Sequence, residues 1–143
     1  MKRIPLIKSI MTPFPYSIDM IDTVDSAKMM MSKHDIRHLP VTDKGKPVGV
    51  ISDRDIRRAF DGDPAEKGND ERHVHDIANL NTYVVDLRAP LDVVVLEMAR
   101  RHIHAGLVVK EGRLIGIFTA TDLFKYLAML LSVFFPRGSD DAA

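Results

Sequence analysis

The chain carries Gly49-Val-Ile-Ser-Asp-Arg-Asp-Ile56 and, 67 residues further on, Gly116-Ile-Phe-Thr-Ala-Thr-Asp-Leu123. Each segment has a glycine, a short β-forming run, and a hydroxyl residue three positions before an aspartate. The match extends outward, because residues 8–60 align without a gap with residues 75–127, and ten of these 53 positions are identical. A single repeat of this kind cannot bury its apolar face alone, so the two copies are expected to share a core. The repeat also predicts a pseudo-twofold axis and paired, near-equivalent clefts.

Length and composition limit the possible classes of protein. A chain of 143 residues can form one compact domain or two lobes that are marginal alone, and the repeat favours two lobes. The 20 acidic and 20 basic residues balance, which disfavours nucleic acid or an anionic membrane as a partner. Cysteine is absent from the sequence, so no disulfide or thiolate metal site is expected. Residues 1–8 lack the apolar segment of a signal peptide, and we expect a cytoplasmic protein.

A polar, glycine-containing stretch divides the two copies. Residues 61–73 have the composition of a solvated linker. We therefore expect a first repeat at 7–60 and a second repeat at 74–130. Residues 131–143 are expected to contain the end of a C-terminal helix and a disordered tail.

The first half of each copy is predicted to be a strand followed by a helix. The strand ends near Ile18 or Val85, and the helix begins after Thr23, a favourable N-cap, or after Pro90 in the second copy. Residues 91–96 have strand propensity. Their repeat partner is more helical, however, and apolar residues at 91, 94, 95 and 98 have helical spacing, so a helix is predicted.

The second half of each copy is predicted to be a β-hairpin followed by another helix. Strands at 38–42 and 47–51 have counterparts at 105–109 and 114–118. Gly45 and Gly112 supply the positive φ that a tight turn between such strands requires. The last helix of each copy starts at Ser52 or Thr119. The chain is therefore expected to be an α/β protein built from two β-α-β-β-α units.

Four sequence fragments in this order resemble the CBS domain, named after cystathionine β-synthase and found as tandem pairs. The fragments are Ile10-Met-Thr12, Ile36-Arg-His-Leu-Pro-Val41 and the two segments quoted at the start. The resemblance covers roughly residues 7 to 130. It implies two repeats packed with pseudo-twofold symmetry, adenine nucleotides bound in clefts between them, frequent homodimers, and ligand-sensing regulation rather than catalysis.

The two motifs Ser52-x-x-Asp55 and Thr119-x-x-Asp122 have two interpretations. In a capping box, the hydroxyl and the carboxylate satisfy free N–H groups at the start of a helix. In a ligand site, the helix start favours a phosphate, and the carboxylate can accept hydrogen bonds from two vicinal ribose hydroxyls. The two roles need not exclude each other. By resemblance, Asp55 and Asp122 would bind ribose, while Ser52 and Thr119 would contact phosphate or ribose.

Positive charge near a phosphate would come from the first copy. Arg37 and His38 resemble the basic pair that many family members direct towards phosphates, and in the second copy His104 takes the place of Arg37. Arg54 is likewise matched by Thr121. We therefore expect two clefts of unequal affinity. Without the resemblance, both arginines would be interpreted as solvated surface charges.

The remaining site candidates are apolar or small residues of the first copy. An adenine ring needs an apolar slot and backbone edges, and residues that could supply them also occur in ordinary cores. These candidates are Thr12, Pro13, Ile18, Ile36 and Pro40.

Metal binding and catalysis are not indicated. His73-x-His75 and His102-x-His104 have a metal-binding spacing but no obvious third ligand. The sequence contains no nucleophile with its base, no P-loop and no dinucleotide fingerprint. We expect a non-catalytic protein with no metal site and no required cofactor, for which AMP, ADP, ATP or a related adenosyl ligand is a regulatory ligand.

Residues 123–135 are apolar on nearly every side. This predicted helix is shorter than the roughly 20 residues that span a bilayer. Its surface needs a cover, either a homodimer contact or a regulated protein partner. Two alternatives to ligand sensing therefore stay open: a dimerisation module with empty clefts, and an adaptor that contacts an enzyme or transporter through this helix.

Overall fold

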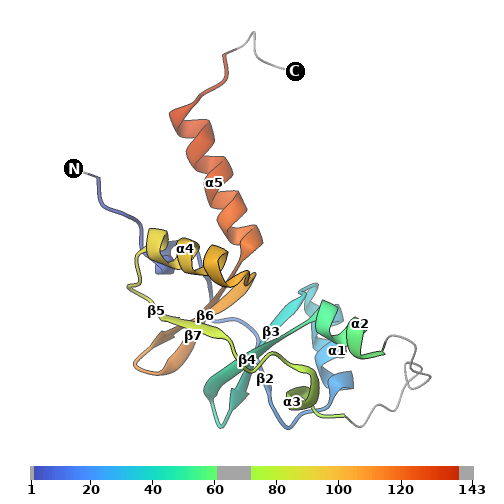
Figure 1. Ribbon diagram of the computed structural model, residues 1–143. Coiled ribbons are helices and arrows are strands. Elements are labelled where there is room, and N and C mark those ends of the chain that lie inside the picture. The colour runs from blue at the N-terminus through green and yellow to red at the C-terminus, as the bar shows by residue number, and fades with distance from the viewer. Residues whose placement is uncertain (1, 61–71, 139–143) are drawn as a thin grey trace.

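The computed structural model describes residues 2–60 and 72–138. Most of the predicted linker at 61–73 and the last residues of the predicted tail, 139–143, lie outside these described residues. Two sheet-and-helix lobes meet along their sheets, and one long helix projects from the second lobe (Figure 1).

The first lobe is a three-stranded sheet with two helices. Its strand order is β2-β3-β4, in which β2 runs parallel to β3 and β3 runs antiparallel to β4. The elements are β2 (Ile18–Asp19), α1 (Val24–His34), β3 (His38–Asp43), β4 (Lys46–Ser52) and α2 (Asp53–Phe60).

The second lobe repeats this order and gains a fourth strand. Its sheet has the order β1-β7-β6-β5, with β5 parallel to β6 and β6 antiparallel to β7. The elements are β5 (Tyr83–Asp86), α4 (Leu91–Arg101), β6 (Ala105–Lys110), β7 (Arg113–Thr119) and α5 (Ala120–Phe134), to which β1 (Thr12–Pro13) is added. The predicted α/β fold with two β-α-β-β-α repeats is therefore confirmed.

The helix predicted at residues 91–96, despite the strand propensity of these residues, is present as part of α4. Helix α4 begins after Pro90 and buries Leu91, Val94 and Met98, which lie on one face at helical spacing. In the first lobe, the Thr23 side chain accepts a hydrogen bond from the Ser26 backbone N–H at 3.2 Å, as expected of an N-cap. Core packing of one apolar face outweighs the β propensity of the valines.

Both hairpins turn through two residues with positive φ. Lys44 and Gly45 have φ of 50° and 83°, and Glu111 and Gly112 have φ of 52° and 78°. Two consecutive positive φ values match the right-handed twist of the flanking strands. The glycines therefore occupy the turn positions that the sequence predicts.

Two short helical turns were not predicted, and each packs on the opposite lobe. They are η1 (Ile7–Ser9) and α3 (Val74–Ile77). Ile7 is fully buried in the core of the second lobe, and its N–H donates to the Ala89 carbonyl at 2.9 Å. Val74 is fully buried in the core of the first lobe, and its N–H donates to the Asp22 carbonyl at 2.8 Å. In Figure 1 the N-terminal segment accordingly lies beside α4, and α3 lies beside the first lobe.

The chain after each turn also stays on the opposite lobe. Thr12 pairs with Ile117 of β7, and Asn79 exchanges backbone hydrogen bonds with Val50 of β4 at 3.0 Å. We call residues 6–14 and 73–81 the crossing segments. A sequence repeat and a packed lobe therefore do not contain the same residues. The first residues of each repeat pack on the lobe formed by the other repeat.

The lobes share a small core of their own. Val50 on β4, Leu107 on β6 and Ile117 on β7 are buried together, and Leu114 packs against them. Val50 and Ile117 occupy equivalent positions in the two repeats. The contact is thus centred on the pseudo-twofold axis, as the repeat predicts.

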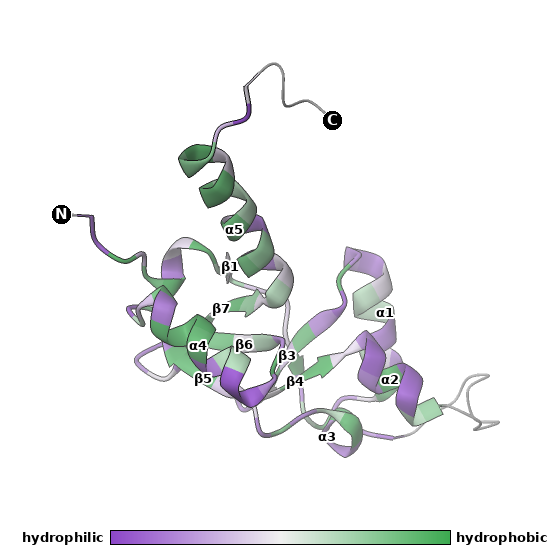
Figure 2. Cartoon of the chain, turned by 45° about the horizontal axis from the view of Figure 1, so that its top comes forward, coloured by the Kyte–Doolittle hydropathy of each residue, from purple (hydrophilic) through white to green (hydrophobic). Residues whose placement is uncertain are grey.

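Helix α5 contributes no buried residue. It points away from both lobes, and much of its length is hydrophobic (Figures 1 and 2). Within residues 2–60 and 72–138, no helix combines the length and apolar character needed to cross a membrane.

Candidate functional site

The Ser/Thr-x-x-Asp motifs form capping boxes at the starts of α2 and α5. Asp55 Oδ2 accepts a hydrogen bond from the Ser52 N–H at 2.9 Å, and the Asp55 N–H donates to Ser52 Oγ at 3.0 Å. Asp122 Oδ2 accepts from the Thr119 N–H at 2.8 Å, and the Asp122 N–H donates to Thr119 Oγ1 at 3.4 Å. The structural role of the motif is therefore present in both copies.

Capping engages one oxygen of each carboxylate. The hydrogen bonds of Asp55 and Asp122 with their capping partners all use Oδ2. Both side chains are half-buried rather than enclosed. An Oδ1 atom held in this way has two lone pairs, which is the acceptor capacity that a ribose hydroxyl requires. Capping and ligand binding are thus geometrically compatible.

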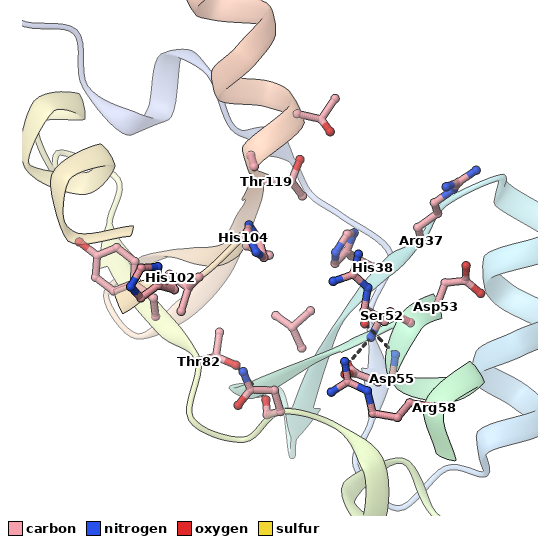
Figure 3. Close-up of a pocket in the computed structure, with 18 of the residues that line it drawn as sticks. Arg37, His38, Ser52, Asp53, Asp55, Arg58, Thr82, His102, His104 and Thr119 are labelled. Carbon is pink, nitrogen blue, oxygen red and sulfur yellow. Dashed lines mark hydrogen bonds between the residues drawn. The ribbon is translucent and has the colours of Figure 1, made fainter. Parts of the chain in front are cut away.

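A cavity between the lobes, called the larger cavity below, has a volume of about 530 Å³. Figure 3 shows Ser52, Asp55 and Arg58 of the first lobe on one side, with His102 and His104 of the second lobe across from them. The crossing segment and the start of β5 close a third side with Asn79, Asn81, Thr82 and Tyr83. Its volume lies within the usual range for small-ligand sites, about 300 to 1,000 Å³.

The smaller cavity has a volume of about 350 Å³ and the reciprocal composition. Thr119 and Asp122 come from the second lobe, and Ile36, Arg37 and His38 come from the start of β3 in the first lobe. The other crossing segment and the residues that follow it supply Thr12, Pro13, Phe14, Pro15 and Tyr16. Each cavity therefore combines the motif of one lobe with the strand start of the other.

Most predicted site residues are brought together. The larger cavity contains Arg37, His38, Ser52, Arg54, Asp55, His104, Thr119 and Thr121. The smaller cavity contains Thr12, Pro13, Ile36, Arg37, His38, Thr119 and Asp122. Arg37, His38 and Thr119 line both, so the two cavities share a wall.

Two of the predicted adenine contacts, Ile18 and Pro40, do not line either cavity. Ile18 is 3% exposed and belongs to the core of the first lobe, and Pro40 is fully buried within β3. Ile18 lies on the edge strand β2 and Pro40 on the central strand β3, and both side chains are buried, so their apolar character reflects core packing.

Two tyrosines belong to the cavities although they were not predicted there. Tyr16 lines the smaller cavity and stacks on His34, with ring centroids 3.6 Å apart. Tyr83 lines the larger cavity, and the Arg101 guanidinium lies 5.1 Å from its ring centroid. Burial, together with the nearby Glu97 carboxylate, raises the pKa of Tyr83. Tyr16 and Tyr83 are an identical pair in the repeat, which is the signal that could have identified them.

Electrostatics at the shared wall centre on His38. Burial lowers the pKa of His38, although the carboxylates of Asp55, Asp122 and Asp53 act in the opposite direction. His104, which faces His38 in Figure 3, adds to the lowering of this pKa. The pKa of His38 therefore depends on the motif aspartates of both cavities.

The histidines do not assemble a metal centre in the described residues. His73 and His75 stack with centroids 5.4 Å apart, and no group of three or more ligating side chains suited to a metal ion occurs within 2–60 and 72–138.

Known proteins with the same architecture were found by sequence and by structure. A CBS domain-containing protein of Dictyostelium discoideum is 31% identical over 136 residues, which cover 88% of this chain and 93% of that protein. A Vibrio cholerae protein assigned to acetoin utilization (AcuB) superimposes with a TM-score of 0.77 at 25% identity, covering 95% of this chain and 99% of that one. The CBS domain pair of protein MJ0100, solved with 5′-methylthioadenosine and S-adenosyl-L-methionine, gives a TM-score of 0.77 at 27% identity, with 90% and 99% covered.

The family assignment follows from a match in both repeats. The family model for the CBS domain matches residues 7–62 and again residues 74–129. These ranges contain both Ser/Thr-x-x-Asp motifs and both crossing segments from residues 7 and 74 onward. Together with the two symmetry-related cavities, they show that this chain belongs to the CBS domain family and is a tandem CBS pair.

Proposed function

We propose that this protein is a non-catalytic regulatory sensor that binds an adenine nucleotide or a related adenosyl ligand between its two lobes. The observation that carries the proposal is the pair of reciprocal cavities, each with a capped Ser/Thr-x-x-Asp motif of one repeat beside the crossing segment of the other repeat. The complex of the related MJ0100 domain pair with two adenosyl compounds supports this ligand class. Such ligands are abundant in the cytoplasm, where the proposal places the protein.

The proposed mechanism is a shift in the relative angle of the lobes. A ligand that contacts Asp55 and the strand start at His104 bridges the two lobes. It binds best at one angle and increases the population of that arrangement. A partner protein that contacts both lobes can then distinguish the liganded state from the free state.

Thermal unfolding in the presence of candidate ligands tests the proposal. We expect at least one of AMP, ADP, ATP, S-adenosylmethionine and 5′-methylthioadenosine to raise the midpoint. A ligand at 100 times its Kd stabilises the folded state by about 2.7 kcal/mol, which corresponds to a shift of several degrees in a chain of this size. If the midpoint stays unchanged with every ligand at millimolar concentration, the proposal is contradicted.

Variants of the motif aspartates locate the response. Asp55→Ala and Asp122→Ala each remove one capping interaction, so the baseline midpoint of each is measured first. The double variant is expected to lose the ligand-dependent increase. Asp25→Ala is a suitable control, because Asp25 lies in the first turn of α1 and lines neither cavity. A ligand response retained in the double variant would show that these carboxylates do not bind the ligand.

A dimerisation or adaptor role is a second candidate, supported by one observation. Helix α5 exposes Phe124, Leu127, Leu131 and Phe134, which are spaced three and four residues apart. This spacing places them along one stripe, as in helices that pack against another helix. We propose a homodimer through α5 as the occupant of this stripe, and it is compatible with ligand sensing.

A further inference from the structure

The two cavities differ strongly in charge. The larger cavity is lined by four arginines and two aspartates, whereas one arginine and one aspartate line the smaller cavity. Three of these arginines, Arg54, Arg57 and Arg58, belong to α2, and we call them the α2 arginine row. Their equivalents on α5 are Thr121, Phe124 and Lys125. The row therefore exists in only one of the two repeats.

Helix geometry keeps the arginine row together at the mouth of the larger cavity. Positions 57 and 58 lie three and four residues after position 54, which makes each of them a neighbour of Arg54 on the helix surface. All three side chains are exposed, and α2 is largely hydrophilic in Figure 2. In Figure 3, Arg58 lies beside Asp55, whereas the Arg37 guanidinium points away from the middle of the cavity. The positive charge here consequently comes from α2 more than from Arg37.

One oxygen of each aspartate in this cavity already has a partner. Asp53 Oδ2 lies 3.1 Å from Arg57 Nη2, and Asp55 Oδ2 accepts the hydrogen bond of the capping box. Within the part of the chain that the structure describes, Arg54 and Arg58 form no ion pair. Like charges one turn apart repel each other. Guanidinium groups bind phosphate oxygens in pairs, so a polyphosphate would relieve this repulsion.

The smaller cavity has the lining expected for a ligand with little charge. Pro13, Pro15, Tyr16, Ile36 and Ile117 provide its apolar surface. Its charged groups are Arg37, which is shared with the larger cavity, and Asp122. An adenosyl group with a thioether side chain suits this lining, because it buries apolar surface without bringing a phosphate towards Asp122.

We propose that the larger cavity binds the polyphosphate chain of an adenine nucleotide at the α2 arginine row, and that the smaller cavity binds an adenosyl ligand without a phosphate chain. This inference rests on the proposed function, since both cavities must first accept adenosyl ligands. It assigns two chemically different signals to one chain.

Calorimetric titration with ATP, AMP and 5′-methylthioadenosine tests the division. The variants are Arg58→Glu and its matched control Lys125→Glu. Lys125 is the repeat equivalent of Arg58 and lines neither cavity. Arg58→Glu is expected to weaken ATP binding about tenfold or more, AMP binding less, and 5′-methylthioadenosine binding by less than about twofold. The control variant is expected to leave all three affinities unchanged.

Salt and the motif aspartates provide two further readouts. ATP affinity should fall as the salt concentration rises, because the contacts are exposed and ionic, whereas 5′-methylthioadenosine affinity should stay nearly constant. Asp55→Ala should reduce ATP binding, and Asp122→Ala should reduce 5′-methylthioadenosine binding, provided that circular dichroism shows both variants folded.

Each outcome separates this inference from the function on which it rests. Equal effects of Arg58→Glu and Lys125→Glu on ATP would overturn the inference, as would equal sensitivity of both ligands to Arg58→Glu and to salt. In those cases adenosyl binding would still stand. Absence of binding for all five ligands of the thermal unfolding test to the unaltered protein would instead contradict the proposed function itself.

Discussion

His38 is one of three residues that line both cavities. It lines the larger and the smaller cavity, and the carboxylates of Asp55 and Asp122 both influence its pKa. A phosphate placed beside it would favour the protonated imidazole, since an opposite charge stabilises the charged form. Occupation of one cavity can thus alter the charge that the other cavity presents.

The lowered pKa of His38 gives a pH dependence with a definite sign. The folded protein binds a proton at His38 less readily than the unfolded chain, whose histidine titrates near 6.5. The stability contributed by the neutral imidazole is therefore complete above that value and is lost as the pH falls below it. Urea unfolding at about pH 7.5 and about pH 5.5 should show a smaller loss of stability for His38→Gln than for the unaltered protein.

An exposed histidine serves as the control for this experiment. His102 lines the same cavity but is exposed to solvent. His102→Gln should retain the pH dependence of the unaltered protein. If His38→Gln loses as much stability as the unaltered protein between the two pH values, His38 is not the group responsible.

At the scale of elements, the crossing segments depend on glycines in the strands that they contact. A Cβ on Gly49 would overlap the backbone carbonyl of Asn79, whereas a Cβ on Gly116 would overlap the side-chain sulfur of Met11. A backbone carbonyl held by a hydrogen bond cannot move without displacing its segment. A methionine side chain can adopt another rotamer.

These two glycines yield a matched comparison. Gly49→Ala should destabilise the protein by about 1 to 3 kcal/mol, as overpacking of a tight contact does. Gly116→Ala should cost less, because the thioether of Met11 can rearrange. Urea midpoints with unchanged m values would measure both effects. Equal destabilisation by the two substitutions would show that the Asn79 carbonyl is not a rigid obstacle.

Sequence patterns predicted the longer elements better than the shorter ones. Helix α4 has three turns of apolar spacing, and its alignment with α1 corrected the strand propensity of its valines. The turns η1 and α3 have three and four residues, too few for a helical period to be recognised. Their crossing depends on backbone hydrogen bonds such as Asn79 to Val50, which leave no side-chain pattern in the sequence.

The candidate site was predictable where motif and repeat coincided. Ser52, Asp55, Thr119 and Asp122 could be identified because the same spacing recurs before two helices. Arg57 and Arg58 could not, because an exposed arginine on a helix resembles any solvated charge until the cavity beside it is known. Their contribution depends on the opposite lobe, which lies far away in sequence.

At the scale of the whole molecule, the exposed apolar stripe of α5 predicts a homodimer. Its apolar stripe includes Leu127, which is 51% exposed. Light scattering after size exclusion should give twice the mass of 16.1 kDa for the unaltered protein. Leu127→Glu places a charge in the stripe and should give the monomer mass.

The same Lys125→Glu variant controls for added charge on this helix. Lys125 lies on the narrow polar face of α5, away from the apolar stripe, so its substitution should preserve the dimer. A monomeric mass for the unaltered protein at tens of micromolar would contradict dimerisation through α5. It would leave the ligand-binding proposal untouched.

The exchange of first turns between the halves has a practical consequence. If the gene were divided between residues 60 and 72, the fragment with Ile7 would lack Val74, and the fragment with Val74 would lack Ile7. Each fragment would miss a buried piece of its own interior, so co-expressed fragments are expected to reassociate by mutual complementation. Such a split pair would report the proposed ligand as a reconstitution signal, because a ligand bound between the lobes would favour reassociation.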